Sequence, residues 1–460
     1  MARKPSTRIG AALPPYYPAT RYDEPYRGQF HFSSQRGWMN DINGLWHYDG
    51  VYYMTYQTVP DSCRFSMETI SLGLATSPDM IHWKQQQVVV RPEDAYGAPG
   101  SGSTVVDIHN TSGFQTGKHP AFVTLFSGST SGVWVIYSND LGRTWQRYPG
   151  NPVVASPTFD PRDPHVFWHG PTGRWVMAIY GPGLGKTSFH TSPDLRAWTP
   201  ASTLEGFGYE CPDMYALAVD GDSSRKKWVL MKADGEYLIG DFDGVRFTPD
   251  AGGPYKSVLS ADFYAAQSFF ADTFPDGRIV QIGWMGAWDT PLGTTPWSQN
   301  ATFPVELGLK TFPEGVRLTR TPIAEIAKLH AAPQVKLGRQ KLPGGANLLA
   351  NVTGKCFDLS AEFDFGANPD NHVQFLLANR NFYYNNKTGL LLRQPFRRGT
   401  KLAIRILRDW SQLEVFAGDG EFSWSERFAF TPDDDRISIA ANKELDILSL
   451  EFHSLDSAWK

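Results

Sequence analysis

Hydrophobic and polar residues alternate in short runs along most of the chain. Runs such as Gly50–Tyr56, Trp134–Tyr137 and Arg174–Ile179 are rich in aromatic and β-branched residues, and Gly, Pro, Asn or Asp residues separate them from their neighbours. Such runs are typical of β-strands joined by hairpins. Helical periodicity is weak, and its clearest example is the short segment Ile323–Leu329. The pattern therefore predicts an all-β protein.

One turn sequence, Ser-x-Asp followed by Trp, occurs at Ser77–Trp83, Ser138–Trp145 and Ser192–Trp198. In such a turn the Asp side chain accepts hydrogen bonds from its own backbone, and the Trp ring packs beneath it. Repetition at intervals of roughly 60 residues is typical of four-stranded propeller blades, each of which needs its neighbours to bury its faces. We therefore predict a five-bladed β-propeller over residues 32–320.

Strand-like runs resume beyond the propeller, for example at Phe357–Phe363 and Leu413–Phe416. Their alternation and close turn signals predict a C-terminal antiparallel β-sandwich over residues 343–460. The intervening stretch 321–342 contains proline and is weakly helical, so we interpret it as a linker. Residues 1–31 form an N-terminal extension in this division of the chain.

Length and charge narrow the classes of function. At 460 residues the chain is long enough for two domains. A net charge of −4 gives no basic surface for nucleic acid or an anionic membrane. Every apolar run is shorter than the roughly 18 residues of a membrane-spanning helix. We therefore expect a neutral, soluble partner, and the oligomeric state is left open.

The ends and the cysteines give weaker indications. The N-terminus is basic, but no apolar stretch of signal-peptide length follows it. We expect a secreted protein whose signal is missing from this sequence, with a cytoplasmic protein as the alternative. The three cysteines, Cys63, Cys211 and Cys356, are too scattered for a disulfide framework or a metal site, although one disulfide is possible.

Three acidic motifs lie far apart at the edges of strand-like runs: Trp38–Gly44, Arg162–Pro164 and Glu210–Asp213. Each alone has an ordinary explanation, because Asp before an Asn-Gly turn, an Arg–Asp pair and a surface Glu are all common. Cys211 is best explained as a small packed thiol. Together the carboxyl groups suit glycoside cleavage, since retaining glycosidases use two of them about 5–5.5 Å apart. A propeller brings distant residues together, because the first strand of each blade lines the central funnel.

The order and wording of these motifs resemble glycoside hydrolase family 32, whose members cleave or transfer β-linked fructose units. That family carries Trp-Met-Asn-Asp-Pro-Asn-Gly, Arg-Asp-Pro and Glu-Cys motifs in the same order. The resemblance runs from about Phe32 to the C-terminus, with further similar segments at Tyr53–Gln57, Gly100–Ser103, Asp262–Phe269, Gly283–Gly286, Phe303–Leu307 and Asp409–Phe416.

The resemblance implies a role for each matching residue. Asp41 would be the nucleophile, Glu210 the general acid/base and Asp163 the transition-state stabiliser. No cofactor and no metal is implied, and the partner would be a fructan or a sucrose-type carbohydrate. The expected substrate-binding residues are Asn40, Gln57, Ser103, Arg162, Asp213, Tyr264 and Trp288.

Two departures from the family pattern bear on the reaction. Ile42 replaces the proline beside the nucleophile, and Leu72 and Leu74 stand where the family has Trp and His. We expect an unusual pocket rim and therefore an unusual acceptor. The hypothesis is cleavage of a fructan, levan favoured, with transfer to a sugar hydroxyl in the manner of levan fructotransferases, which release cyclic difructose, or to water.

The alternatives come from other classes. A plain hydrolase of levan, inulin or sucrose is the nearest. Ser138–Trp145 also matches the Asp-box of sialidase propellers, but such turns occur in unrelated propellers. A sugar-binding protein without activity is weaker still, since all three carboxyl groups are present. Linkage preference and exo or endo attack are not determined by the sequence.

Overall fold

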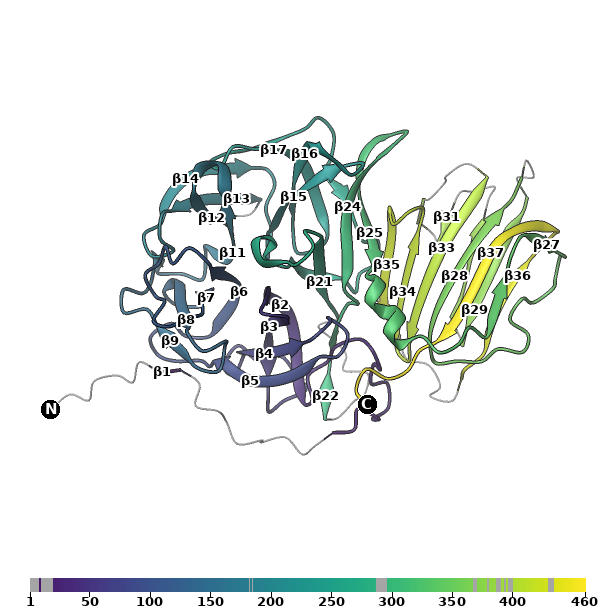
Figure 1. Cartoon of the computed structure of the whole chain (residues 1–460), viewed down its shortest axis with the longest axis horizontal. Helices are drawn as coiled ribbons and strands as arrows, with labels where there is room; N and C mark the ends of the chain where they lie inside the picture. Colours follow the sequence, from purple (N-terminus) through teal and green to yellow (C-terminus); the bar gives the residue numbers. More distant parts are fainter. Residues whose placement is uncertain are drawn as a thin grey trace.

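The structure is a computed structural model that describes residues 8–9, 20–181, 183, 185–286, 296–366, 370–378, 380–385, 390–392, 394–395, 400–428 and 434–460. A ring of small sheets, formed by the N-terminal part of the chain, lies beside a layered pair of sheets formed by the C-terminal part (Figure 1). Helix within the described residues is limited to short 3-10 turns: η1 (Gly170–Thr172), η2 (Ala271–Thr273) and η3 (Ala324–Leu329).

The first three blades of the ring are separate antiparallel sheets. Blade 1 contains β2 (Gly37–Tyr48), β3 (Val51–Val59), β4 (Ser71–Ser77) and β5 (Lys84–Val90), with β22 (Trp297–Ser298) parallel to β2. Blade 2 contains β6 (Pro99–Asp107), β7 (Ala121–Gly128), β8 (Gly132–Ser138) and β9 (Trp145–Arg147), with β1 (Arg8–Ile9) and β10 (Val154–Ala155) at its outer side. Blade 3 contains β11 (Arg162–His169), β12 (Arg174–Tyr180), β13 (Lys186–Ser192) and β14 (Thr199–Glu205).

The last two blades are joined in one sheet by a single parallel pairing of β15 with β24. Blade 4 contains β15 (Asp213–Val219), β16 (Asp222–Met231), β17 (Glu236–Phe242) and β18 (Phe247–Pro249), with β19 (Tyr255–Lys256) beside β17. Blade 5 contains β20 (Tyr264–Ser268), β21 (Ile279–Met285), β24 (Val305–Phe312) and β25 (Gly315–Pro322), with β23 (Asn300–Ala301) beside β21.

The C-terminal part is a sandwich of two antiparallel sheets packed over one apolar core. The larger sheet contains β26 (Val335–Leu337), β27 (Gln340–Leu342), β37 (Leu445–Ser454), β28 (Cys356–Asp364), β33 (Lys401–Asp409), β34 (Gln412–Ala417) and β35 (Phe422–Arg427). The smaller contains β32 (Gln394–Pro395), β31 (Leu390–Leu391), β30 (Arg380–Asn385), β29 (His372–Leu377) and β36 (Ile437–Ala441). The predicted all-β fold, a propeller followed by a sandwich, is confirmed.

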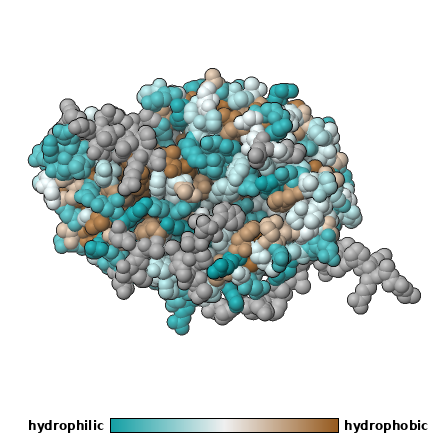
Figure 2. All heavy atoms as spheres, turned by 180° about the vertical axis from the view of Figure 1, so that it is seen from behind, coloured by the Kyte–Doolittle hydropathy of each residue, from teal (hydrophilic) through white to brown (hydrophobic). Residues whose placement is uncertain are grey.

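The predicted division at residues 32, 321 and 343 stays a prediction. The stretch interpreted as a linker, 321–342, contains η3 and the two short strands β26 and β27, and both strands pair with β37 of the sandwich. None of the helices in the described ranges is long and apolar enough to cross a membrane. On the face shown in Figure 2, hydrophilic and hydrophobic residues are interspersed.

The three Ser-x-Asp…Trp turns have the geometry that the sequence predicts. Asp79 accepts hydrogen bonds from the backbone of Ile81 and His82, at 3.1 and 2.9 Å, within its own turn. The indole of Trp83 donates to the carbonyl of Met80 at 2.8 Å and is buried beneath the turn. The turns at Asp140 and Asp194 follow the same pattern, so one local motif ends a hairpin in each of the first three blades.

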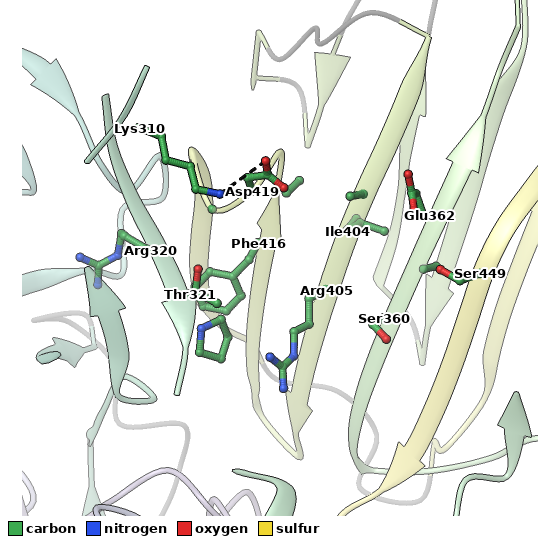
Figure 3. A pocket seen from close by; sticks show the side chains of 15 residues that line it. Lys310, Arg320, Thr321, Ser360, Glu362, Ile404, Arg405, Phe416, Asp419 and Ser449 are labelled. Carbon is green, nitrogen blue, oxygen red and sulfur yellow. Dashed lines mark ion pairs between the residues drawn. The ribbon is translucent and has the colours of Figure 1, made fainter. Parts of the chain in front are cut away.

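Propeller and sandwich meet along several polar contacts. The edge strand β35 bonds to the segment before β20, where Leu259 N donates to Ser423 O at 2.9 Å and Arg427 N donates to Asp262 Oδ2 at 2.9 Å. A cavity of about 430 Å³ lies between β24 and β25 on one side and the sandwich strands on the other. Figure 3 shows Lys310 and Asp419 facing each other across it, with an ion pair of 3.5 Å.

A buried charge cluster also joins the two parts. The ring of His31, fully buried, contacts Asp409 Oδ2 through Nδ1 at 2.9 Å and Glu414 Oε2 through Nε2 at 3.2 Å. Asp409 also accepts backbone N–H bonds from Gln29, Phe30 and His31. Burial alone lowers the pKa of His31, but the hydrogen bonds and negative charges of both carboxylates outweigh it and raise the pKa to about 9. The imidazolium therefore holds the segment before β2 against the sandwich.

We predict that this cluster makes stability fall with alkaline pH. Because the folded-state pKa of His31 exceeds its unfolded value of about 6.5, its contribution is complete below pH 6.5 and is lost as pH rises through about 9. His31→Gln leaves two buried carboxylates without their cation and should lower the free energy of unfolding by about 3 kcal/mol at pH 6.5. Thermal unfolding between pH 6 and 10 measures this, and the variant should lack the alkaline decline.

The matched control is His330→Gln. His330 also contacts a carboxylate, Asp358 Oδ2 at 2.9 Å, but its side chain is 22% exposed. A change below about 1 kcal/mol is expected there. Equal losses in both variants, or an unchanged alkaline decline in His31→Gln, would contradict the prediction.

Candidate active site

The first strand of each blade lines the centre of the ring. These strands are β2, β6, β11 and β15, labelled in Figure 1, and β20, which contacts β2 and β15. Their beginnings carry the acidic motifs. Asp41 is in β2, Asp163 is the second residue of β11, and Glu210 lies three residues before β15. Each carboxyl group therefore comes from a different blade and faces the same end of the ring, as the contacts below show.

Asp41 is partly buried in β2, and its carboxylate is held by three donors. Ser101 Oγ donates to Oδ2 at 2.7 Å, Asn40 Nδ2 donates to Oδ1 at 3.0 Å, and Cys211 Sγ lies 3.5 Å from Oδ2. Burial raises the pKa of Asp41, the Ser101 and Asn40 hydrogen bonds oppose that rise, and the charge of Glu210 adds to it. The site therefore holds a desolvated carboxylate that neighbouring donors keep oriented.

Asn43–Gly44 does not form the turn expected after Asp41, because β2 continues through both residues to Tyr48. A side chain at Gly44 would place its Cβ 2.1 Å from Thr104 Oγ1 of β6, so glycine is required for the close approach of the two strands. Asn43 Oδ1 accepts the N–H of Gly102 at 3.0 Å and ties β2 to β6. The motif thus fixes the distance between two blades at the site.

Asp163 is buried and linked to Glu210 through the residue that follows Glu210. Its Oδ2 accepts the N–H of Cys211 at 3.2 Å and lies 3.8 Å from Arg162 Nε. Asp163 and Cys211 both have left-handed backbone conformations, with φ of 60° and 48°, which cost free energy in residues other than glycine. Burial, and then the charges of Glu210 and Asp41, raise the pKa of Asp163 to about 7.

Glu210 is partly exposed and accepts two strong hydrogen bonds. Arg162 Nη2 donates to Oε1 at 2.7 Å, and the phenol of Tyr264 donates to Oε2 at 2.5 Å. Tyr264, the first residue of β20, is itself held edge-on against Trp284 with ring centroids 6.2 Å apart. Blades 3, 4 and 5 therefore converge on this one carboxylate.

Two other expected sugar ligands also reach the site. Asn40 Nδ2 donates to Gln57 Oε1 as well as to Asp41, and the indole of Trp38 donates to Asn40 Oδ1 at 2.9 Å. Gln57 belongs to β3, and its side chain is buried beside β2. Trp288, another of the expected sugar ligands, lies outside the described residues.

Ser103 and Asp213 both form hydrogen bonds with other groups of the protein. Ser103 Oγ donates to Pro164 O and accepts from Val166 N, both at 2.9 Å, which joins β6 to β11. Asp213 is fully buried, accepting from Ser268 Oγ at 2.8 Å and Gln281 Nε2 at 2.6 Å. These side chains connect blades, and we leave them out of the substrate contacts proposed below.

Ser101 was not among the predicted site residues, although its hydroxyl makes the shortest hydrogen bond to Asp41. Ser101 and Ser103 lie two residues apart and would share a face in a regular strand. The pairing of β6 with β7 is irregular between Pro99 and Gly102, and this bulge separates their directions. The Gly-Ser-Gly-Ser sequence indicated a special turn, but the choice between its two serines required the three-dimensional structure.

The departures at Ile42, Leu72 and Leu74 are buried in the apolar interior, with exposures of 0%, 0% and 2%. Ile42 packs with the core that joins blades 1, 4 and 5, while both leucines pack in the core between blades 1 and 2. None of the three side chains reaches the surface, and the expected effect on the rim of the family's missing Pro, Trp and His stays a prediction.

In the part of the chain that the structure describes, no three His, Cys, Asp or Glu side chains are grouped as metal ligands. The arrangement instead places two carboxyl groups, Asp41 and Glu210, near a third, Asp163, with Arg162 beside them. Such an array suits acid–base and covalent chemistry at a glycosidic carbon.

Comparison with known families agrees with this geometry. Residues 31–322 match the glycosyl hydrolases family 32 N-terminal domain, and residues 325–454 match the glycosyl hydrolases family 32 C-terminal domain. The chain belongs to glycosyl hydrolase family 32. It is therefore an enzyme of a family that hydrolyses fructans and sucrose.

Among the family 32 relatives, a levanase of Bacillus subtilis is 34% identical over 95% of this chain and 72% of its own length. An extracellular exo-inulinase of Aspergillus niger is 30% identical over 96% of both chains. The crystal structure of an exo-inulinase from Aspergillus awamori superposes with a TM-score of 0.85 at 26% identity, covering 95% of this chain and all of that one. A β-fructofuranosidase from Schwanniomyces occidentalis, at 21% identity and the same TM-score over 95% and 99% of the two chains, shares the fold.

We predict that Asp163→Asn stabilises the protein at neutral pH. A carboxyl group whose folded pKa is raised from about 4 to about 7 destabilises the folded state increasingly between those pH values. The amide removes that penalty, so the free energy of unfolding should rise by roughly 1–3 kcal/mol at pH 8 and by much less at pH 4.5. Thermal unfolding at both pH values measures it.

Asp241→Asn is the control, because it removes the same charge from an outer strand where Asp241 pairs with Lys227 and is 71% exposed. The difference in melting temperature between Asp241→Asn and the parent should be the same at both pH values. A destabilised Asp163→Asn at pH 8 would show that the Asp163 charge is net favourable and would refute the prediction.

Proposed function

We propose that this enzyme cleaves β-fructofuranosidic bonds in a fructan, levan favoured, with retention of configuration through a covalent fructosyl-enzyme. The observation that supports it most strongly is the convergence of Asp41, Asp163 and Glu210 from three blades, linked through Arg162 and Cys211. Retaining glycosidases need this pairing of an attacking carboxylate with a proton donor.

In this proposal Asp41 attacks the anomeric carbon of the fructosyl unit. Its carboxylate must be ionised, which burial opposes, and the donors Ser101 and Asn40 supply the compensating hydrogen bonds. They also fix the direction of the attacking oxygen, which lowers the entropic part of the barrier. The new bond joins an Asp41 oxygen to the anomeric carbon as the bond to the leaving oxygen breaks.

Glu210 gives its proton to that leaving oxygen and then accepts one from the incoming hydroxyl or water. Both oxygens of Glu210 accept hydrogen bonds in the structure, from Arg162 and Tyr264, which is the arrangement of the base form. Tyr264 and Arg162 hold the carboxyl group in place in either state.

Asp163 would bind fructose hydroxyls, with hydrogen bonds that strengthen as positive charge develops on the ring. Asn40, Gln57, Arg162 and Tyr264 are the further proposed sugar contacts. Trp288 remains part of the proposal from the sequence alone. No cofactor enters this scheme.

The preference for levan is supported by the 34% identity to the B. subtilis levanase over nearly the whole chain. Exo-inulinases and invertases among the relatives make inulin and sucrose the alternative substrates. The A. niger relative is an extracellular exo-inulinase, which supports the proposal that this protein is also secreted.

Water is the proposed acceptor. Transfer to a sugar hydroxyl, with cyclic difructose as product, was inferred from an altered pocket rim. Ile42, Leu72 and Leu74 are buried in the apolar cores, so none of these side chains itself offers a contact to an acceptor. Transfer is kept as the second candidate, on the absence of the family's Trp and His at positions 72 and 74.

We predict that Asp41→Asn and Glu210→Gln each lower turnover of fructan by at least about 1,000-fold while leaving substrate binding and the melting temperature near those of the parent. Initial rates and calorimetric titration with fructo-oligosaccharides measure both quantities. The Asp241→Asn variant again serves as the control with unchanged turnover. Near-parental turnover in Asp41→Asn would refute the assignment of the nucleophile.

The acceptor and the linkage are tested by incubating the enzyme with levan, inulin and sucrose separately and resolving early products by chromatography. We expect the highest rate on levan and release of free fructose or linear oligosaccharides, because water resolves the fructosyl-enzyme. Cyclic difructose as the main early product would establish the transferase instead. A higher kcat/KM on inulin would overturn the levan preference.

A further inference from the structure

A fourth carboxyl group, Asp160, lies at the active site and has no part in the scheme above. Its Oδ1 accepts a hydrogen bond from Arg162 Nη1, and the other terminal nitrogen of the same guanidinium, Nη2, donates to Glu210 Oε1 at 2.7 Å. One cation therefore lies between Asp160 and Glu210. A bridging arginine of this kind is a rigid connection, since its planar fork presents donors in fixed directions.

Two aromatic rings lie close to this guanidinium. Its carbon lies 5.2 Å from the ring centroid of Phe159 and 4.6 Å from that of Tyr180, and the Arg162 side chain is only 16% exposed. Phe159 has room there because residue 100 is glycine, where an added Cβ would lie 2.9 Å from Phe159 Cε2. Arg162 therefore cannot follow Glu210 freely.

Asp160 is itself held by its own loop. The carbonyl of Asp160 accepts hydrogen bonds from Ser156 Oγ at 2.5 Å and Thr158 Oγ1 at 2.9 Å. The side chain is about one third exposed, at 32%, and is bonded to Arg162. The loop thus delivers a negative charge to the far side of the guanidinium.

Glu210 lies among several titratable groups. Asp41, Asp163 and Asp160 are negative, and Tyr264, Tyr209 and Cys211 are the uncharged titratable neighbours. Among the described residues, the cation that forms ion pairs with these carboxylates is Arg162. Asp160 offsets part of its charge.

We propose that Asp160 is a positioning residue that anchors Arg162 and shares its charge with Glu210, and that the alkaline limit of activity depends on this sharing. This inference rests on the proposed role of Glu210 as the general acid. It deepens that role by naming the group that sets the alkaline limit of activity.

The test is the pH dependence of kcat/KM on the best fructan substrate, for the parent and Asp160→Asn. Loss of the Asp160 charge leaves Arg162 to Glu210 alone, so the alkaline limb should move to lower pH by about half to one pH unit. Asp160→Glu, which restores the carboxylate, should move the limb back toward that of the parent. Asp241→Asn removes an equal charge far from the site and should leave the limb in place.

An alkaline limb that stays at the parental pH in Asp160→Asn, or a uniform loss of activity at all pH values, would overturn the proposal. The thermal unfolding of each variant is measured alongside its pH profile. If Asp160→Asn is unstable, the alkaline limb of Asp160→Glu is compared directly with that of the parent. If Asp160→Glu folds with parental stability but fails to bring the limb back, a charge-sharing role for Asp160 is excluded.

Glu210→Gln separates this proposal from the proposed function. If Glu210→Gln abolishes turnover but Asp160→Asn leaves the limb unchanged, the role of Asp160 is wrong and the function stands. If Glu210→Gln retains parental turnover with its alkaline limb, the assignment of the acid is wrong, and the inference about Asp160 is overturned with it.

Discussion

Close packing of five inner strands around the ring axis is the constraint on which the active site depends. Gly44 allows β2 to approach Thr104 of β6, and Gly102 has no room for a side chain because a Cβ there would lie 1.9 Å from Leu125 O. A side chain at Gly44 would push blades 1 and 2 apart, and one at Gly102 would separate β6 from β7 within blade 2. The three carboxyl groups come from different blades, so their mutual distances are set by this packing.

The same packing places several negative charges where water is scarce. Burial raises the pKa values of Asp41 and Asp163, and oriented hydrogen-bond donors oppose this rise. Ser101 and Asn40 act on Asp41, the N–H of Cys211 acts on Asp163, and Arg162 is divided between Asp160 and Glu210. Stability is spent here for chemistry, as is common at active sites.

The sandwich contributes to the site without reaching it. Its edge strand β35 bonds the segment that ends in Asp262, two residues before the Tyr264 that holds Glu210. On the other side, Asp409 and Glu414 hold His31 and the backbone before β2, the strand that carries Asp41. The sandwich thus supports two of the inner strands from outside the ring, which gives a physical reason for the two domains to stay together.

Much of this protein was determined by the sequence alone. Alternating runs and the repeated Ser-x-Asp…Trp turn depend on local backbone chemistry, so they predicted the strands, the blades and the hairpin geometry seen at Asp79. The acidic motifs also carried enough information to predict which carboxyl groups meet and to indicate the family. These features are local, or they repeat, and a linear pattern records both.

The tertiary structure decided what depends on distances between blades. The bulge in β6 turned Ser101 rather than Ser103 toward Asp41, and the continuous path of β2 replaced an expected turn at Asn43–Gly44. The tertiary structure also showed that Ile42, beside Asp41, is buried in the core. The sharing of Arg162 by Asp160 and Glu210 joins residues 50 positions apart along the chain, and no sequence pattern records a contact that exists only once the blades have closed into a ring.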